Sequence, residues 1–150
     1  MPQASVSPHK LSLEISIWTV KLDKLERILH VDDDPQLVEI VGLALELIGG
    51  FQIKQAVSGT SAIGLLNEFA PQLIVTDVQM PDLTGPEMME QVRKLPDYKD
   101  CPAIYLTARA GPENQKLLSD PNDLAIIVKP FDPMTLADEI REIWKAKYSA

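Results

Sequence analysis

Residues 72–95 read QLIVTDVQMPDLTGPEMMEQVRKL, and this stretch decides the fold class. Its first part is an apolar run without the alternation of a half-exposed strand, which predicts a strand covered on both faces. The turn-rich segment MPDLTG follows, and a helix-period segment then runs from Pro86 to Leu95. A buried strand that leads into a helix is the repeating unit of a parallel sheet.

The same strand-then-helix unit recurs on both sides of this stretch. Further apolar runs are RILHV (27–31), FQIKQAV (51–57), PAIYLT (102–107) and LAIIV (124–128), and helix-period segments occupy 35–48, 60–69, 112–119 and 133–147. Strands and helices therefore alternate along the chain. The sequence predicts an α/β fold, a (βα)5 doubly wound five-stranded parallel sheet.

Polar residues followed by proline mark two of the predicted helix starts. Asp34-Pro35 and Asp132-Pro133 each place an N-cap residue before a proline at the first helical position. The first helix should end at Gly49-Gly50. Its buried face is predicted as one apolar stripe, made of Leu37, Val41, Ala44, Leu45 and Ile48.

Composition limits the class of protein. A chain of 150 residues, 45% of them hydrophobic, is long enough for one core and too short for two ordinary domains. A net charge of −8 disfavours direct DNA binding. With no apolar run of membrane-spanning length and no signal-peptide pattern, we expect a soluble, cytoplasmic protein without a membrane association. Cys101 is the single cysteine, which predicts a buried thiol and no disulfide within the chain.

Residues 1–26 lie outside the repeating pattern, and residues 27–147 form the predicted domain. Between Leu11 and Leu25 the apolar residues fit both the alternation of a strand and the spacing of a helix. The N-terminal extension is therefore either an added edge element, a dimer contact or a disordered leader.

Polar side chains stand at the carboxyl ends of the predicted strands, where open parallel sheets bind their ligands. These residues are Asp32 and Asp33 after the first run, then Asp77, Thr107 and Lys129. Three carboxylates brought together repel one another and need a cation. Because all these ligands are oxygens, the pattern predicts Mg2+ as the cofactor.

A carboxylate, a metal site, a hydroxyl and an ammonium around one pocket are the parts of a phosphoryl-transfer site. Asp77 would attack the phosphorus atom in line. The metal ion and Lys129 would neutralise charge on the phosphoryl oxygens, while Thr107 donates a hydrogen bond. His30 lies inside a strand and receives no such role.

Four segments, ILHVDDDP, LIVTDVQMPDLTG, IYLTARA and VKPF, resemble the signature segments of response-regulator receiver domains of two-component systems, and their spacings are similar too. Each segment alone is a weak signal, but four in order on successive strand ends are specific. The resemblance covers residues 27–147. It implies the flavodoxin-like strand order 2-1-3-4-5 and a chemotaxis-type receiver whose only reactions are its own phosphorylation and dephosphorylation.

The resemblance also implies metal ligands and partners. Asp33 would bind Mg2+ directly, Asp32 through water or hydrogen bonds, and Gln79 through its backbone carbonyl, together with Asp77. The phosphoryl donor would be a sensor histidine kinase or a phosphotransfer protein, and the receiver would signal to an output protein that the sequence does not identify.

The remaining roles that the resemblance implies concern signalling. Asp77 would be the phosphoacceptor, Thr107 the switch hydroxyl and Lys129 the lysine that contacts the phosphoryl group, with a cis bond before Pro130. Similar domains carry an aromatic switch residue three positions before this lysine, where this chain has Ile126. That difference puts the usual coupling in doubt. Pro112 together with Pro121 predicts a short or distorted fourth helix.

The same residues leave other functions open. The receiver could be a phosphorelay intermediate or a regulator that docks on a separate enzyme. A haloacid-dehalogenase-type phosphatase also uses a strand-end Asp and Mg2+, but it needs a second carboxylate where this chain has Gln79. Flavodoxins share the fold, yet their phosphate loop is rich in Ser, Thr and Gly, whereas this chain has three aspartates at 32–34.

Overall fold

A computed structural model describes residues 24–148 of the chain. Its sheet has five strands, namely β1 (Arg27–Val31), β2 (Gln52–Ala56), β3 (Leu73–Asp77), β4 (Ala103–Thr107) and β5 (Asp123–Val128). All neighbouring pairs are parallel. The order is β2-β1-β3-β4-β5, which confirms both the predicted fold class and the predicted strand order.

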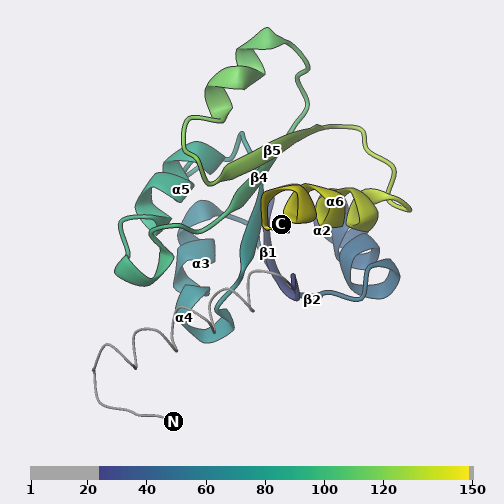
Figure 1. Ribbon diagram of the computed structural model, residues 1–150, viewed down its shortest axis with the longest axis horizontal. Coiled ribbons are helices and arrows are strands. Elements are labelled where there is room, and N and C mark those ends of the chain that lie inside the picture. The colour runs from purple at the N-terminus through teal and green to yellow at the C-terminus, as the bar shows by residue number, and fades with distance from the viewer. Residues whose placement is uncertain (1–23, 149–150) are drawn as a thin grey trace.

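Helical segments connect the strands and cover both faces of the sheet (Figure 1). They are α2 (Pro35–Gly42), the π-helix η1 (Leu43–Ile48), α3 (Gly59–Gly64), α4 (Leu66–Phe69), α5 (Gly85–Val92), the 3-10 helices η2 (Pro96–Tyr98) and η3 (Pro112–Leu117), and α6 (Leu136–Tyr148). The α2 and α6 helices lie on one face, and α3, α4 and α5 lie on the other.

Each face of the sheet has its own hydrophobic core. Successive side chains on a strand point to opposite faces, so Ile28 joins the core under α2 and α6 while Leu29 joins the core under α3 and α5. Leu73 and Ile74 divide in the same way. All four side chains are fully buried. Burial on both faces explains why these strands are apolar without alternation.

The first helix departs from the predicted stripe in its last turn. Val41, Ala44 and Leu45 are buried as predicted, but Ile48 is 48% exposed. The chain follows a π-helix from Leu43 onward, with the amide of Gly49 donating to the carbonyl of Ala44. A π turn contains more residues than an α turn, so Ile48 does not return to the sheet side.

The two predicted proline starts have different outcomes. The Asp34 side chain accepts a hydrogen bond from the amide of Gln36 at 2.9 Å, so Asp34 is the N-cap of α2 as predicted. The predicted start at Asp132-Pro133 is wrong, because α6 begins at Leu136. Asp132 instead accepts a hydrogen bond from the amide of Met134, and this local turn precedes the helix.

Two further helices differ in extent from their sequence patterns. The predicted helix over residues 60–69 divides at Leu65 into α3 and α4. The segment after Pro112 forms only a 3-10 helix with no fully buried residue, which confirms the prediction of a short or distorted fourth helix. Since no residue of η3 is fully buried, few apolar contacts hold this segment in place.

The N-terminal prediction for residues 1–26 lies almost entirely outside the described residues and stays a prediction. Lys24, Leu25 and Glu26 are described, and Leu25 packs against the core under α6. Among residues 24–148, no helix combines the length and the apolar character that a membrane crossing requires.

Cys101 should be unreactive in the folded protein. Its side chain is buried as predicted, and burial raises the pKa of its thiol to about 12. Because only the thiolate reacts with thiol reagents, we expect no labelling by a disulfide-exchange reagent at pH 8 and complete labelling in denaturant. Native labelling at the rate of a free thiol would contradict the buried position.

Candidate functional site

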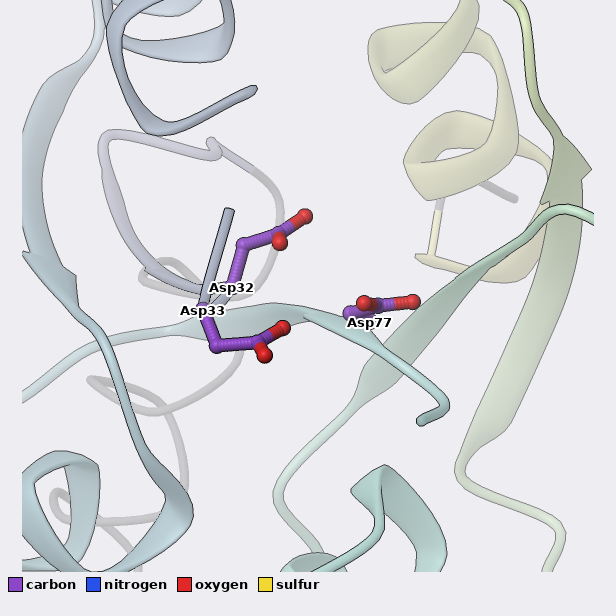
Figure 2. A group of neighbouring side chains, drawn as sticks. All are labelled: Asp32, Asp33 and Asp77. Atoms are coloured by element: carbon purple, nitrogen blue, oxygen red, sulfur yellow. The ribbon is translucent and has the colours of Figure 1, made fainter. Parts of the chain in front are cut away.

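Three carboxylates meet at the carboxyl edge of the sheet. Asp32 and Asp33 directly follow β1, and Asp77 is the last residue of the neighbouring strand β3 (Figure 2). One carboxylate oxygen from each lies within 4.8 Å of the others. Asp32 is fully buried, Asp77 is 9% exposed and Asp33 is exposed. The structure thus brings the predicted acidic residues together in a site that opens to solvent on one side.

Backbone contacts fix two of these carboxylates. Asp32 Oδ1 accepts a hydrogen bond from the amide of Asp34 at 3.0 Å, and Asp77 Oδ1 accepts one from the amide of Val78 at 2.8 Å. The start of α5 packs closely behind Asp77, since a Cβ atom at Gly85 would lie 2.5 Å from the Asp77 carbonyl oxygen. A glycine is therefore required where α5 meets the strand that carries Asp77.

Lys129 supplies the positive charge of the site. It follows β5, and its Nζ lies 3.1 Å from Asp77 Oδ1 and 3.7 Å from Asp32 Oδ2. The Lys129-Pro130 peptide bond is cis, as predicted. The amide of Lys129 donates to the carbonyl of Thr107 at 2.7 Å, which ties the chain after β5 to the end of β4.

The other residues that the sequence singled out differ in burial. Thr107 is buried at the end of β4, and its hydroxyl oxygen accepts a hydrogen bond from the amide of Arg109 at 3.1 Å. Gln79 is exposed in the loop after β3. Ile126 is partly buried in β5 beside Tyr105 and packs against the core under α3 and α5. The threonine hydroxyl is therefore held by the loop that follows its own strand.

Asp82, in the turn-rich segment MPDLTG, connects the loop after β3 to α3. Its carboxylate accepts hydrogen bonds from the amides of Gly59 and Thr60 at 3.2 and 2.9 Å. These bonds, first of all those from Thr60, hold the pKa of Asp82 well below its usual range. The contact positions the loop that leads from the site to α5.

The acidic residues fit a hard divalent cation. Burial is the main cause that raises the pKa of Asp32, and the nearby Asp77 and Asp33 raise it further against the opposing effects of the Asp34 amide and Lys129. Its Oδ2 atom is buried and accepts no hydrogen bond from the described residues. A cation that prefers oxygen ligands would stabilise this charge, and Mg2+ meets that requirement.

The family follows from the match of sequence and fold. A family model described as the response regulator receiver domain matches residues 28–141, which include every residue of the site. The chain belongs to the response-regulator receiver family. Receiver domains are signalling domains of two-component systems, and they bind Mg2+ in an acidic pocket such as the one formed by Asp32, Asp33 and Asp77.

Solved structures and curated relatives agree with this assignment. The chemotaxis response regulator CheY4 of Vibrio cholerae is 28% identical, covering 80% of this chain and 99% of its own, with a TM-score of 0.72. An uncharacterized 14.6 kDa protein of Leptolyngbya boryana is 40% identical over 73% of this chain and 82% of its own length. Response regulator Rre1 of Synechocystis is 30% identical over 77% of this chain. The receiver spans about half the length of Rre1 and of several other relatives.

The structure adds a buried histidine that the sequence prediction left without a role. His30 is fully buried in β1, and its Nε2 lies 3.9 Å from Asp32 Oδ2. Burial, with a smaller effect of Lys129, lowers the pKa of His30 to about 3, so its ring is neutral near pH 7. Strand alternation places residues 30 and 32 on the same side of the sheet. This alternation is the feature of the sequence that could have indicated the contact of His30 with Asp32.

Proposed function

We propose that this receiver accepts a phosphoryl group on Asp77 from a phosphohistidine of a partner protein. Asp77 Oδ1 is held by the Val78 amide and faces Lys129, which leaves Oδ2 to attack phosphorus. The phosphorus–nitrogen bond of the donor breaks as the bond to Oδ2 forms, and the histidine departs with the electron pair. The observation that carries the proposal is the contact of 3.1 Å between Lys129 Nζ and the Asp77 carboxylate.

The chain's own residues would hold Mg2+ and neutralise charge. Asp33, Asp77 and the backbone carbonyl of Gln79 would bind the ion directly, and Asp32 would bind it through water or hydrogen bonds. When bound, Mg2+ supplies charge neutralisation between the acceptor and the phosphoryl oxygens. Lys129 would contact a phosphoryl oxygen with its ammonium, and Thr107 would donate a hydrogen bond to another.

The phosphoryl donor would be a histidine kinase or a phosphotransfer protein, and the receiver would signal to an output protein. A helix next to the site offers an apolar surface for the donor. Ile40, Leu43 and Leu47 are 40%, 51% and 73% exposed on α2 and η1, and α2 begins two residues after Asp33. Exposed apolar side chains in a group favour a protein partner. We also propose a cytoplasmic location, because phosphoryl donors and output proteins of two-component systems act there.

Incubation with Mg2+ and acetyl phosphate tests the proposed reaction. The intact mass should rise by one phosphoryl group, the gain should disappear when EDTA is added first, and hydroxylamine should remove it because the product is an acyl phosphate. An unchanged mass with acetyl phosphate and with phosphoramidate would overturn the proposal. A gain that resists hydroxylamine would place the phosphoryl group on a different residue type.

Replacing Asp33 by alanine should weaken Mg2+ binding without loss of fold. Asp33 is exposed, so its removal leaves no cavity, and one fewer carboxylate reduces the repulsion within the site. We expect Mg2+ affinity, followed by amide NMR shifts, to fall at least about tenfold. The free energy of unfolding should be unchanged or slightly higher.

Asp34→Asn is the matched control for this change. It also removes one negative charge beside the site, yet asparagine is as good an N-cap as aspartate. This variant should bind Mg2+ nearly as the wild type does. Equal affinities of the two variants would mean that Asp33 acts only through its charge and is no ligand.

Switching should proceed through Thr107 without an aromatic partner. A phosphoryl group shifts the balance of two states only by interacting differently with them, and charge-assisted hydrogen bonds from Lys129 and Thr107 supply roughly 1.5–3 kcal/mol each. A hydroxyl that turns to the phosphoryl group gives up the amide of Arg109. We therefore expect a beryllofluoride mimic to shift the amide signals of Arg109 and of η3, while Ile126 changes little.

Amide NMR spectra with and without the mimic provide the measurement, and Thr107→Ala is the control. In that variant the signals of the site should still shift, but those of Arg109 and η3 should not. Shifts confined to Asp32, Asp33 and Asp77 in the wild type would contradict this switch.

A further inference from the structure

We propose that His30 and Gln55 form a positioning pair that orients the Asp32 carboxylate toward the metal ion. The inference rests on the proposed Mg2+ site and assigns to it two residues for which the family resemblance implies no role. Both lie on neighbouring strands, since β1 and β2 pair with His30 opposite Gln55. Neither would touch the phosphoryl group, and their effect would pass through Asp32.

The side-chain amide of Gln55 sets the tautomer of His30. Its Nε2 lies 2.7 Å from the carbonyl oxygen of Val38 and 3.0 Å from His30 Nδ1. A carbonyl oxygen can only accept, so this end of the amide must be the nitrogen, and its two hydrogens serve the two acceptors. His30 Nδ1 is thus an acceptor, and the ring proton resides on Nε2.

The Nε2 proton of His30 faces the Asp32 carboxylate in a buried environment. The Nε2 to Oδ2 distance is 3.9 Å, and both side chains are fully buried. Asp32 Oδ1 is already held by the Asp34 amide, so Oδ2 is the oxygen whose direction can vary. Donors flank it, with His30 Nε2 at 3.9 Å and Lys129 Nζ at 3.7 Å. A shift of the carboxylate by less than an ångström toward the ring would complete a hydrogen bond.

Gly42 leaves room for the side-chain amide of Gln55. A Cβ atom at Gly42 in α2 would lie 2.9 Å from Gln55 Oε1, so a side chain here would push the amide out of place. Contacts through Gln55 therefore join α2, β2 and β1 to the acidic site. Groups that hydrogen-bond a metal ligand from behind fix its orientation, and their loss commonly weakens metal binding 10- to 100-fold, as an order of magnitude.

The test compares Mg2+ affinity in three proteins by amide NMR titration. His30→Leu fills the buried position in β1 with an apolar side chain and removes the N–H donor, so the Mg2+ affinity should fall by about tenfold or more. His30→Gln places an amide N–H near the position of Nε2, and it should recover most of that loss. A purely structural role would not give this recovery, because glutamine packs less well than leucine among apolar neighbours.

Nitrogen-15 shifts of the His30 ring give a second readout that needs no phosphorylation. We expect the Nε2–H tautomer in the metal-free wild type and a change at Nε2 when Mg2+ is added. Should His30→Leu fail to fold, Gln55→Leu, at a partly exposed position of the edge strand β2, frees the ring and should also lower the affinity.

The outcomes separate this inference from the proposed function. A wild type that binds no Mg2+ at these carboxylates overturns both. A wild type that binds normally, together with His30→Leu of equal affinity, overturns the positioning pair alone. An Nδ1–H tautomer in the wild type does so as well, because the ring would then present no proton to Asp32.

Discussion

Asp77→Asn should abolish phosphorylation of this receiver by acetyl phosphate. The substitution keeps the size of the side chain and its hydrogen-bonding oxygen toward the Val78 amide, so the fold should persist. It removes the carboxylate that would form the bond to phosphorus, and an amide is a far weaker nucleophile. Intact mass spectrometry after incubation with Mg2+ should therefore detect no added phosphoryl group, against near-complete modification of the wild type.

Asp34→Asn again serves as the matched control, because it makes the same chemical change two residues after Asp32 at an exposed position. It should be phosphorylated like the wild type. A phosphoryl group on Asp77→Asn, located by peptide mapping after borohydride reduction of the acyl phosphate, would assign the acceptor to another carboxylate. Asp33, exposed at the same site, would then be the first residue to examine.

The fold could be predicted because its decisive signals are local. Apolar strands without alternation, followed by helix-period segments, leave few alternatives to a parallel sheet. Helix ends were harder, since they depend on contacts between elements. Gly49 shows the reason: a Cβ atom there would lie 2.7 Å from that of Ala137, so the close approach of η1 and α6 decides how the first helix ends. Periodicity within one segment contains no information on such an approach.

In the site, too, local signals could be predicted from the sequence and contacts between elements could not. Strand ends gather at one edge of a parallel sheet, so the meeting of Asp32, Asp77 and Lys129 followed from their positions in the sequence. The contact of His30 with Gln55 did not, because it depends on which residues of two strands lie opposite each other. Strand alternation could have given the side of the sheet for His30. Its partner is determined by the register between β1 and β2.

A buried ion pair between Arg93 and Asp123, which the sequence analysis did not predict, should contribute strongly to the free energy of unfolding. Arg93, just after α5, has Nη2 at 2.8 Å from Asp123 Oδ1, and their side chains are only 11% and 2% exposed. The Tyr105 hydroxyl donates to the same oxygen at 3.2 Å, and the amide of Asp120 donates to Asp123 Oδ2 at 3.1 Å. Both oxygens of Asp123 are thus acceptors from buried or partly buried donors at the start of β5.

Asp123→Asn should therefore lower the free energy of unfolding by about 3 kcal/mol, the lower end of the usual cost of breaking a buried ion pair. The lower end is expected because Arg93 keeps its hydrogen bonds to the Cys101 carbonyl and its contact with Asp120. An amide also places an NH2 group where one of the two accepting oxygens stood, so a donor would face a donor. Domains of this size are stable by only about 5–15 kcal/mol, so urea unfolding should show a large loss.

Asp120→Asn is the control, since its carboxylate lies 4.0 Å from Arg93 Nη1 and its side chain is 38% exposed. Water screens such a pair, and we expect a loss of less than about 1 kcal/mol. If the unpaired charge is the cause, adding Arg93→Met to Asp123→Asn should recover part of the stability, because no buried guanidinium then lacks its carboxylate. A loss for Asp123→Asn no larger than for Asp120→Asn would show that the Arg93–Asp123 pair contributes little to the fold.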